Sequence, residues 1–162
     1  MDTYDYESPV GWIEISADNE ALLRIHFQKE APITPSKMSN SIIDDCLQQL
    51  EQYFSGTLTE FKLPFVFTGT PFQNKVWQGL QRIPFGQTIS YKDFAIQLGD
   101  VKAIRAVAHS NGLNPFAVAI PCHRVIGSDG TLTGYSGGLW RKKWLLDHEN
   151  KIKPTGQQRM EF

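Results

Sequence analysis

The sequence predicts an α+β protein in two parts: a small antiparallel sheet with one helix, then a helical region containing a helix-turn-helix. In the first 28 residues apolar and polar positions alternate, as they do in half-buried strands. Beyond residue 70, apolar residues recur at helical spacing in short segments that end at glycine or proline. The charge divides at the same place, with −7 over residues 1–69 and +6 over residues 70–153.

The first part is predicted to be a three-stranded meander followed by a helix. The segments "YDYES", "GWIEISA" and "ALLRIHFQ" have strand character, and "SPVG" and "ADNE" supply the turns between them. The stretch "SIIDDCLQQLEQYFSG" carries apolar residues at helical spacing and ends at Gly56. Cys46 falls on that apolar stripe, so we interpret it as a small buried hydrophobe without chemistry.

The second part is predicted to begin with a helix that has Thr70 as its N-cap and Pro71 in its first turn. A short helix between Ser90 and Gly99 is followed by another that ends at Gly112. This pair has the pattern of a helix-turn-helix with residues 102–111 as the second helix.

After this pair, "HRVIGSDGTLTGY" predicts a small hairpin around Asp129 and Gly130, and "GGLWRKKWLLDHEN" predicts a closing helix. We therefore divide the chain into an N-terminal support domain (1–69), a C-terminal functional domain (70–153) and a tail (154–162).

Composition narrows the class of protein. With 162 residues and 41% hydrophobic content, the chain is typical of a globular protein. The longest apolar run is "FAVAI", far short of a membrane span, and the acidic start does not match a signal peptide, so we expect a cytoplasmic protein. Two cysteines at no metal-binding spacing predict no disulfide framework, no metal and no cofactor. The basic half predicts a polyanionic partner, although an accidental distribution of surface charge gives the same count.

Cys122 is the residue whose surroundings suggest chemistry. It follows Pro121, which shapes the backbone, and it precedes a histidine and an arginine. A thiol near cations is a candidate for a lowered pKa and a nucleophilic role, whereas a lone buried cysteine has a purely structural role. Because adjacent side chains diverge, His123 is expected to act on the thiol through a water, with Asp147 or Glu149 orienting the imidazole.

Five motifs considered together resemble the O6-alkylguanine-DNA alkyltransferase family. They are "IPFGQTISY", "KAIRAV", "NP" followed by "IPCHRV", "GYSGG" and "WLLDHE", in this order within residues 70–150. The resemblance implies a ribonuclease H-like N-terminal domain and a winged-helix-like C-terminal domain. It also implies direct repair of DNA, in which the alkyl group of O6-alkylguanine moves irreversibly to the protein's own cysteine after base flipping, and it leaves O4-alkylthymine open as a second substrate.

The same resemblance implies a role for each residue that matches a motif. Cys122 accepts the alkyl group, His123 and Glu149 form the relay, Asn114 fixes the geometry around the thiol, and Tyr91 donates to the departing guanine. Three residues are implied to bind the base, namely Tyr135, Ser136 and Val125. Four are implied to meet the minor groove of double-stranded DNA, with Arg105 entering the base stack: Arg105, Ala106, Ala108 and Gly112. The protein is expected to act as a monomer.

The residues alone are also compatible with two other functions. A helix-turn-helix protein that binds DNA without transferring anything would leave Cys122 incidental. A cysteine hydrolase would use the same cysteine, histidine and acid to turn over an ester or amide. Relatives with a structural zinc in the first domain hold it through cysteines and histidines that are absent here. A related group of lesion sensors has tryptophan at the position of Cys122, so this sequence is not one of them.

Overall fold

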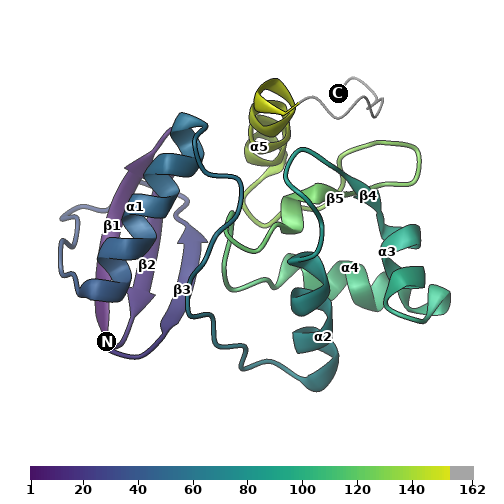
Figure 1. The fold of residues 1–162 in the computed structure, drawn as a ribbon, viewed down its shortest axis with the longest axis horizontal. Helices are drawn as coiled ribbons and strands as arrows, with labels where there is room; N and C mark the ends of the chain where they lie inside the picture. Colours follow the sequence, from purple (N-terminus) through teal and green to yellow (C-terminus); the bar gives the residue numbers. More distant parts are fainter. Residues whose placement is uncertain (154–162) are drawn as a thin grey trace. The chain divides into compact units, whose positions relative to one another are not determined.

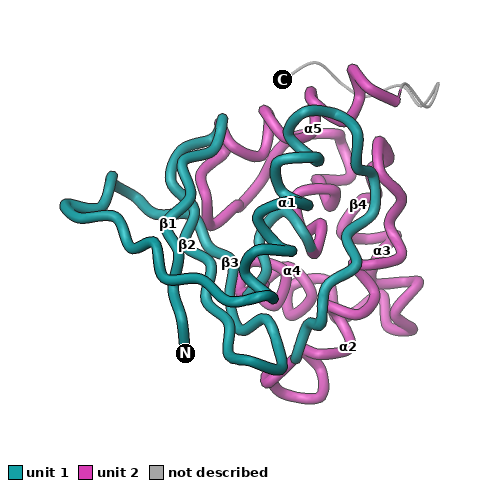
Figure 2. The backbone as a smooth tube through the Cα atoms, turned by 60° about the vertical axis from the view of Figure 1, so that its left-hand side comes forward, with its two compact units in different colours: residues 1–66, 115–119 teal, residues 67–114, 120–162 magenta. Residues whose placement is uncertain are grey.

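The computed structural model describes residues 1–153, and the predicted tail (154–162) lies outside the described residues. Two compact units make up the chain, as Figure 2 shows. Unit 1 contains residues 1–66 and 115–119, and unit 2 contains residues 67–114 and, of the described residues, 120–153. That residues 1–69 and 70–153 act as separate domains stays a prediction.

Unit 1 is an antiparallel sheet of three strands in the order β1-β2-β3 with one helix packed on it (Figure 1). The elements are β1 (Asp2–Ser8), β2 (Gly11–Ala17), β3 (Leu22–Phe27) and α1 (Ser41–Ser55). The predicted meander and helix are thus confirmed. Alternation in β2 sends Ile13 and Ile15 into the core, where burying each such side chain stabilises the fold by about 1.5–3 kcal/mol.

Local sequence fixes both ends of α1. The side chain of Asn40 accepts a hydrogen bond from the backbone N–H of Ile43, which satisfies one of the free donors of the first turn. At the other end Gly56 has φ of 90°, a left-handed conformation that a residue with a Cβ adopts at a cost. The buried side of the helix carries Cys46 and Leu50, so the interpretation of Cys46 as a core residue is confirmed.

Residues 115–119 join unit 1 through the backbone. The N–H of Ile25 donates to the carbonyl of Pro115 at 2.9 Å, and the N–H of Ala117 donates to the carbonyl of Ile25 at 2.9 Å. Phe116, completely buried, stacks at a tilt against Phe65 with 5.0 Å between ring centroids. The first four residues of the apolar run that precedes Cys122, residues 116–119, are therefore buried in unit 1.

Unit 2 is mainly helical and carries a short two-stranded parallel ladder (Figure 1). Its elements are α2 (Pro71–Leu80), β4 (Ile89–Ser90), α3 (Tyr91–Gln97), the 3₁₀ turn η1 (Val101–Ala103), α4 (Ile104–Gly112), the 3₁₀ turn η2 (Cys122–Arg124), β5 (Val125–Ile126) and α5 (Leu139–Ile152). The predicted caps are confirmed, since Thr70 forms a capping box with Gln73 and Ser90 caps α3. No helix within residues 1–153 is long and apolar enough to cross a bilayer.

The predicted hairpin around Asp129 and Gly130 is wrong. The turn exists, with the N–H of Gly127 donating to the carbonyl of Thr131 at 2.9 Å, but no strand returns from it. Instead β5 pairs in parallel with β4, which lies 36 positions earlier in register. The residues after the turn lack alternating apolar positions, so Val125 and Ile126 become buried against a distant partner that local sequence does not reveal.

The predicted helix-turn-helix is present as α3 and α4, with one difference at the start of the second helix. Residues 101–103 form a 3₁₀ turn, η1, rather than the first turn of α4. Asp100 caps this turn by accepting from the N–H of Lys102 at 2.9 Å. Further along, the indole N–H of Trp77 donates to the carbonyl of Ser110 at 2.8 Å and fastens α4 to α2.

Candidate active site

The candidate site lies in unit 2 and is centred on Cys122, the first residue of η2. The residue is 4% exposed. The side chain of Asn114 and the hydroxyl of Tyr135 form hydrogen bonds to its thiol, and Lys142 is the cation that acts on it. Burial raises the pKa of Cys122 above its ordinary value, while these three neighbours act in the opposite direction. The prediction of a lowered thiol pKa is therefore wrong, because the sequence does not show burial.

His123, Glu149 and Arg124 form a buried network that begins at the residue after Cys122. The imidazole Nε2 lies 2.6 Å from Glu149 Oε2. Arg124 donates from Nε to Oε1 at 2.8 Å and from Nη2 to Oε2 at 3.1 Å, and the N–H of Gly86 reaches Oε1 at 3.2 Å. Burial by itself raises the pKa of Glu149, but His123 and Arg124 outweigh it and hold the pKa well below its ordinary value.

The ionised carboxylate fixes the tautomer of His123. A carboxylate can only accept hydrogen bonds, so Nε2 carries the hydrogen and Nδ1 carries a lone pair. Burial lowers the pKa of His123 more than Glu149 raises it, so the neutral imidazole is favoured. Nδ1 is buried and has no hydrogen-bond partner among the described residues. The side chain therefore presents a free base atom inside a closed polar site.

Of the two acids that the sequence offered, the structure selects Glu149. Asp147 is about half exposed and pairs with Lys143, four residues earlier on α5, at 2.7 Å between Oδ2 and Nζ. Glu149, by contrast, is 1% exposed and contacts the imidazole directly. A half-exposed ion pair on a helix surface contributes little to stability and leaves both side chains free to move. A buried carboxylate, by contrast, is held in one orientation by its hydrogen-bond partners.

Tyr91 begins α3 and lies in a second polar cluster of the site. The amide nitrogen of Asn111 lies 3.3 Å from the phenol oxygen and 3.2 Å from the carbonyl oxygen of Cys122. The side chain of Thr133 also hydrogen-bonds to the phenol. Burial is the main cause that raises the pKa of Tyr91, so its hydroxyl stays protonated.

Lys142 completes this cluster from α5. Its Nζ donates to the carbonyl oxygen of Thr133 at 3.0 Å and lies 5.7 Å from the ring centroid of Tyr91. Burial lowers the pKa of Lys142 to about 8, although the nearby thiol of Cys122 acts to raise it. A buried cation that faces the nucleophile is thus partly neutral near physiological pH.

Sequence reasoning missed three members of the site: Asn111, Arg124 and Lys142. A signal for Lys142 was present, because residues 142, 145, 146 and 149 form one stripe along α5 in which two leucines lie between the two charged residues. A charge on an apolar stripe is either buried with a partner or placed there for function. Arg124 follows His123 directly, and Asn111 lies on the buried side of α4 with Val107.

The residues predicted to meet DNA gather on the outer side of α4. Arg105 and Ala106 are exposed and Ala108 is half-buried. A Cβ added to Gly112 would meet no atom within 4 Å, so the protein's own packing does not require a glycine there. Of the predicted base-binding residues, Val125 is buried in β5, Ser136 is exposed, and the half-buried Tyr135 reaches Cys122 with its hydroxyl.

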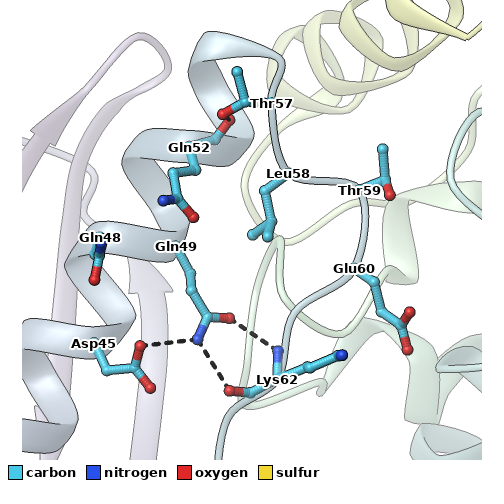
Figure 3. A pocket seen from close by; sticks show the side chains of 9 residues that line it. All are labelled: Asp45, Gln48, Gln49, Gln52, Thr57, Leu58, Thr59, Glu60 and Lys62. Atoms are coloured by element: carbon cyan, nitrogen blue, oxygen red, sulfur yellow. Dashed lines mark hydrogen bonds between the residues drawn. The ribbon is translucent and has the colours of Figure 1, made fainter.

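A separate hollow lies in unit 1 between α1 and the segment that follows it (Figure 3). Its volume is about 450 Å³, and polar side chains dominate its lining. Gln49 fixes its shape by donating to Asp45 and by exchanging hydrogen bonds with the backbone of Lys62 at 2.9 and 3.0 Å. None of its lining residues belongs to the candidate site. Within residues 1–153, no cluster of histidine, cysteine and acidic side chains could hold a metal ion.

Two family models match the chain in succession. Residues 4–67 match the ribonuclease-like domain of 6-O-methylguanine DNA methyltransferase, and residues 71–151 match the DNA-binding domain of the same protein family. Together they span both units apart from short stretches at their ends.

Relatives and solved structures agree with these matches. A methylated-DNA–protein-cysteine methyltransferase of Shigella flexneri is 46% identical over 88% of this chain and 82% of its own length. Another from Methanosarcina barkeri is 43% identical over 91% and 96%. The crystal structure of Mycobacterium tuberculosis OGT in complex with DNA superposes with a TM-score of 0.86 at 38% identity, covering 96% of both chains.

Proposed function

Since the chain belongs to the 6-O-methylguanine DNA methyltransferase family, we propose that it repairs DNA by taking the alkyl group of O6-alkylguanine onto Cys122. It is a methylated-DNA–protein-cysteine methyltransferase in this proposal, and it needs no cofactor. The observation that carries the assignment to Cys122 is its place next in sequence to a histidine whose buried Nδ1 has no partner among the described residues and whose Nε2 contacts Glu149. A cysteine kept only for packing has no need of such a relay.

The transfer needs one proton to leave the thiol and another to reach the guanine. The Cys122 sulfur forms a bond to the alkyl carbon as the bond from that carbon to guanine O6 breaks. The thiol proton passes through a water to Nδ1 of His123, and the ionised Glu149 stabilises the imidazolium that results. Tyr91, whose raised pKa keeps its hydroxyl protonated, donates to the departing guanine.

The base is held by groups around the thiol. In the proposal, the carbonyl groups of Cys122 and Val125 accept from the exocyclic amine of guanine, while Tyr135 and Ser136 line the pocket. Asn114 keeps the nucleophile in place: its amide nitrogen donates to the carbonyl of Ile120 at 2.8 Å, and its side chain also meets the thiol.

The DNA is approached by the outer side of α4. The target carbon lies inside the duplex, so the guanine must be flipped out, which costs a few kcal/mol. Arg105 takes the place of the extruded base in the stack, and the small residues Ala106, Ala108 and Gly112 let the helix enter the minor groove closely. The charge of +6 over residues 70–153 supplies the attraction for phosphates. One chain is sufficient, so the protein acts as a monomer.

The protein is consumed by one reaction. The product is a thioether, whose sp³ carbon lacks the carbonyl that allows an acyl-enzyme to be hydrolysed. We also propose that it works in the cytoplasm, since both Cys46 and Cys122 are free thiols and the reaction requires a reduced one.

The test is incubation with duplex DNA that carries a labelled O6-methyl group. The proposal expects the label to move to protein, up to one equivalent, and to be lost when Cys122 is replaced by serine. DNA binding without any transfer of label would instead indicate a helix-turn-helix regulator. Continuous release of product from an ester or amide would indicate a hydrolase.

A further inference from the structure

The side chain of Asn111 lies where the nucleophile and the proton donor meet, and its neighbours fix which way its amide points. The residue is 1% exposed, near the end of α4. One amide atom lies 3.2 Å from the carbonyl oxygen of Cys122. A carbonyl oxygen can only accept a hydrogen bond, so the atom that faces it is Nδ2. The same nitrogen lies 3.3 Å from the phenol oxygen of Tyr91, and its two hydrogens therefore serve two acceptors.

The direction of this hydrogen bond decides where the phenol hydrogen points. Because the oxygen of Tyr91 accepts from Asn111, the hydrogen of its own hydroxyl must go to another group. The other partner is the hydroxyl of Thr133, which can both accept and donate. The phenol hydrogen can therefore rest on Thr133 in the free protein and be released when a base enters.

We infer that Asn111 is a positioning residue that directs the hydroxyl of Tyr91 toward the departing guanine and ties it to the backbone of the nucleophile. This inference rests on the proposed function, since it assumes that Tyr91 is the proton donor. Asn111 stands on α4, the helix whose outer side carries Arg105, so one helix connects the DNA-facing surface to the donor. The Oδ1 atom of Asn111 is buried without a partner among the described residues, so it is an acceptor that a donor from water or substrate would satisfy.

The decisive experiment is a double-mutant cycle with Asn111→Leu and Tyr91→Phe, measuring the rate of methyl transfer from duplex DNA to Cys122. If Asn111 acts through Tyr91, Asn111→Leu slows transfer about tenfold in the wild-type background but less than about twofold when Tyr91 is already phenylalanine. Equal slowing in both backgrounds, or no slowing in the first, overturns the inference.

A second variant guards against a simple failure to fold. Asn111→Asp keeps the shape of the side chain but reverses its chemistry. An ionised carboxylate takes the phenol hydrogen and repels the Cys122 carbonyl, and a protonated one can serve only one of the two acceptors. Transfer per folded chain should be at least as slow as with leucine, while duplex affinity changes little. The free energy of unfolding should fall, because a buried carboxyl group replaces the neutral amide, so the rates are compared per folded chain. Transfer at the wild-type rate contradicts the inference.

The matched control is Ser110→Ala. Ser110 is similarly buried and adjacent on α4, but it accepts the hydrogen bond from Trp77 through its backbone carbonyl, which the substitution keeps. This control should transfer at the wild-type rate, and slowing as large as that of Asn111→Leu would assign the effect to helix packing instead.

A leaving-group series separates positioning from structure. An electron-poor O6-alkylguanine, whose ring needs less help from a proton, should react with nearly the same rate in Asn111→Leu and wild type, whereas the ordinary base should not. Equal defects on both substrates contradict the inference. If wild type itself transfers no methyl group, it is the proposed function that fails, and the two failures are thus distinguishable.

Discussion

The two cysteines of this chain are both buried, yet they lie in opposite surroundings. Cys46, on α1 in unit 1, is 0% exposed among apolar residues, and burial together with Asp45 raises its pKa to about 12. Cys122, in unit 2, is buried to a similar extent, but Asn114, Lys142 and Tyr135 each oppose the effect of burial on its pKa.

Because we propose Cys122 as the acceptor and interpret Cys46 as inert, burial alone cannot distinguish the two thiols. The feature that differs between them is the set of polar groups around Cys122. Unit 2 keeps an arginine, a lysine, a glutamate and a histidine buried near Cys122, although each is costly to remove from water unless it is paired. Packing alone gives no reason to keep four such groups together, whereas proton transfer at a nucleophile does.

The largest effect is expected when the two cysteines are replaced in turn. Cys122→Ala should abolish methyl uptake, because the acceptor atom is lost. Cys46→Ala should leave uptake per folded chain unchanged and lower the free energy of unfolding by about 1–2 kcal/mol, since it removes only a small buried group. Transfer assays and denaturant unfolding on both variants measure this, and loss of uptake in Cys46→Ala would show that the comparison is wrong.

Glu149→Gln should have the next largest effect, on both transfer and stability. The rate should fall about 100-fold because the imidazole loses the group that fixes its tautomer. The free energy of unfolding should fall by about 3–5 kcal/mol, because Arg124 stays buried without its carboxylate partner. Asp147→Asn, which removes a half-exposed carboxylate on the same helix, is the control and should change stability by less than about 0.5 kcal/mol.

The pH dependence of that stability has a definite sign. The pKa of Glu149 is lower in the folded protein than its ordinary value of 4.5. Its stabilising contribution is therefore complete above pH 4.5 and is lost as pH falls toward the folded value. The stability difference between wild type and Glu149→Gln should shrink on acidification, and a difference that grows there would contradict the assignment.

Lys142→Met tests the cation that opposes burial at Cys122. Transfer should slow about tenfold at neutral pH, because the developing thiolate loses a nearby positive charge. The lysine pKa is about 8 in the folded protein and 10.5 ordinarily, so the unfolded state binds more protons between these two pH values. The stability of wild type relative to the variant should therefore increase as the pH rises from about 8 to 10.5. Lys143→Met, an exposed neighbour paired with Asp147, should show neither change.

Arg105→Ala should have the smallest effect on the rate of transfer to Cys122. Repair of duplex DNA should slow about fivefold, because the flipped guanine loses the side chain that fills its place in the stack. Reaction with the free base should be unchanged, since Arg105 is exposed on α4 and makes no contact in the network around Cys122. Equal slowing on both substrates would remove Arg105 from base flipping.

The sequence predicted what depends on local chemistry. The caps at Thr70 and Ser90 and the left-handed end at Gly56 follow from residue types at fixed offsets. The parallel pairing of β4 with β5 could not be predicted, because the two partners lie far apart in the chain and a turn sequence between them suggested a hairpin.

The residues of the candidate site also fall into those that local sequence predicted and those that depend on distant neighbours. The motifs identified Cys122, His123 and Glu149, and the structure brings His123 into contact with Glu149 while Cys122 precedes the histidine in η2. Asn111 and Arg124 were missed because their roles arise from neighbours 11 to 41 positions away. The direction of the thiol pKa was wrong for a related reason: burial is a property of the folded chain, and it outweighs the effect of Lys142, a cation that the sequence analysis did not identify.

The central claim is that the polar surroundings of Cys122, and not burial, decide which thiol accepts the alkyl group. The most direct measurement is a titration of the native protein with excess O6-methylguanine duplex, followed by mass analysis of the peptides that contain each cysteine. The account predicts one methyl group per chain, on Cys122, with Cys46 recovered as the free thiol. A methyl group on Cys46, or continued turnover beyond one equivalent, would contradict it.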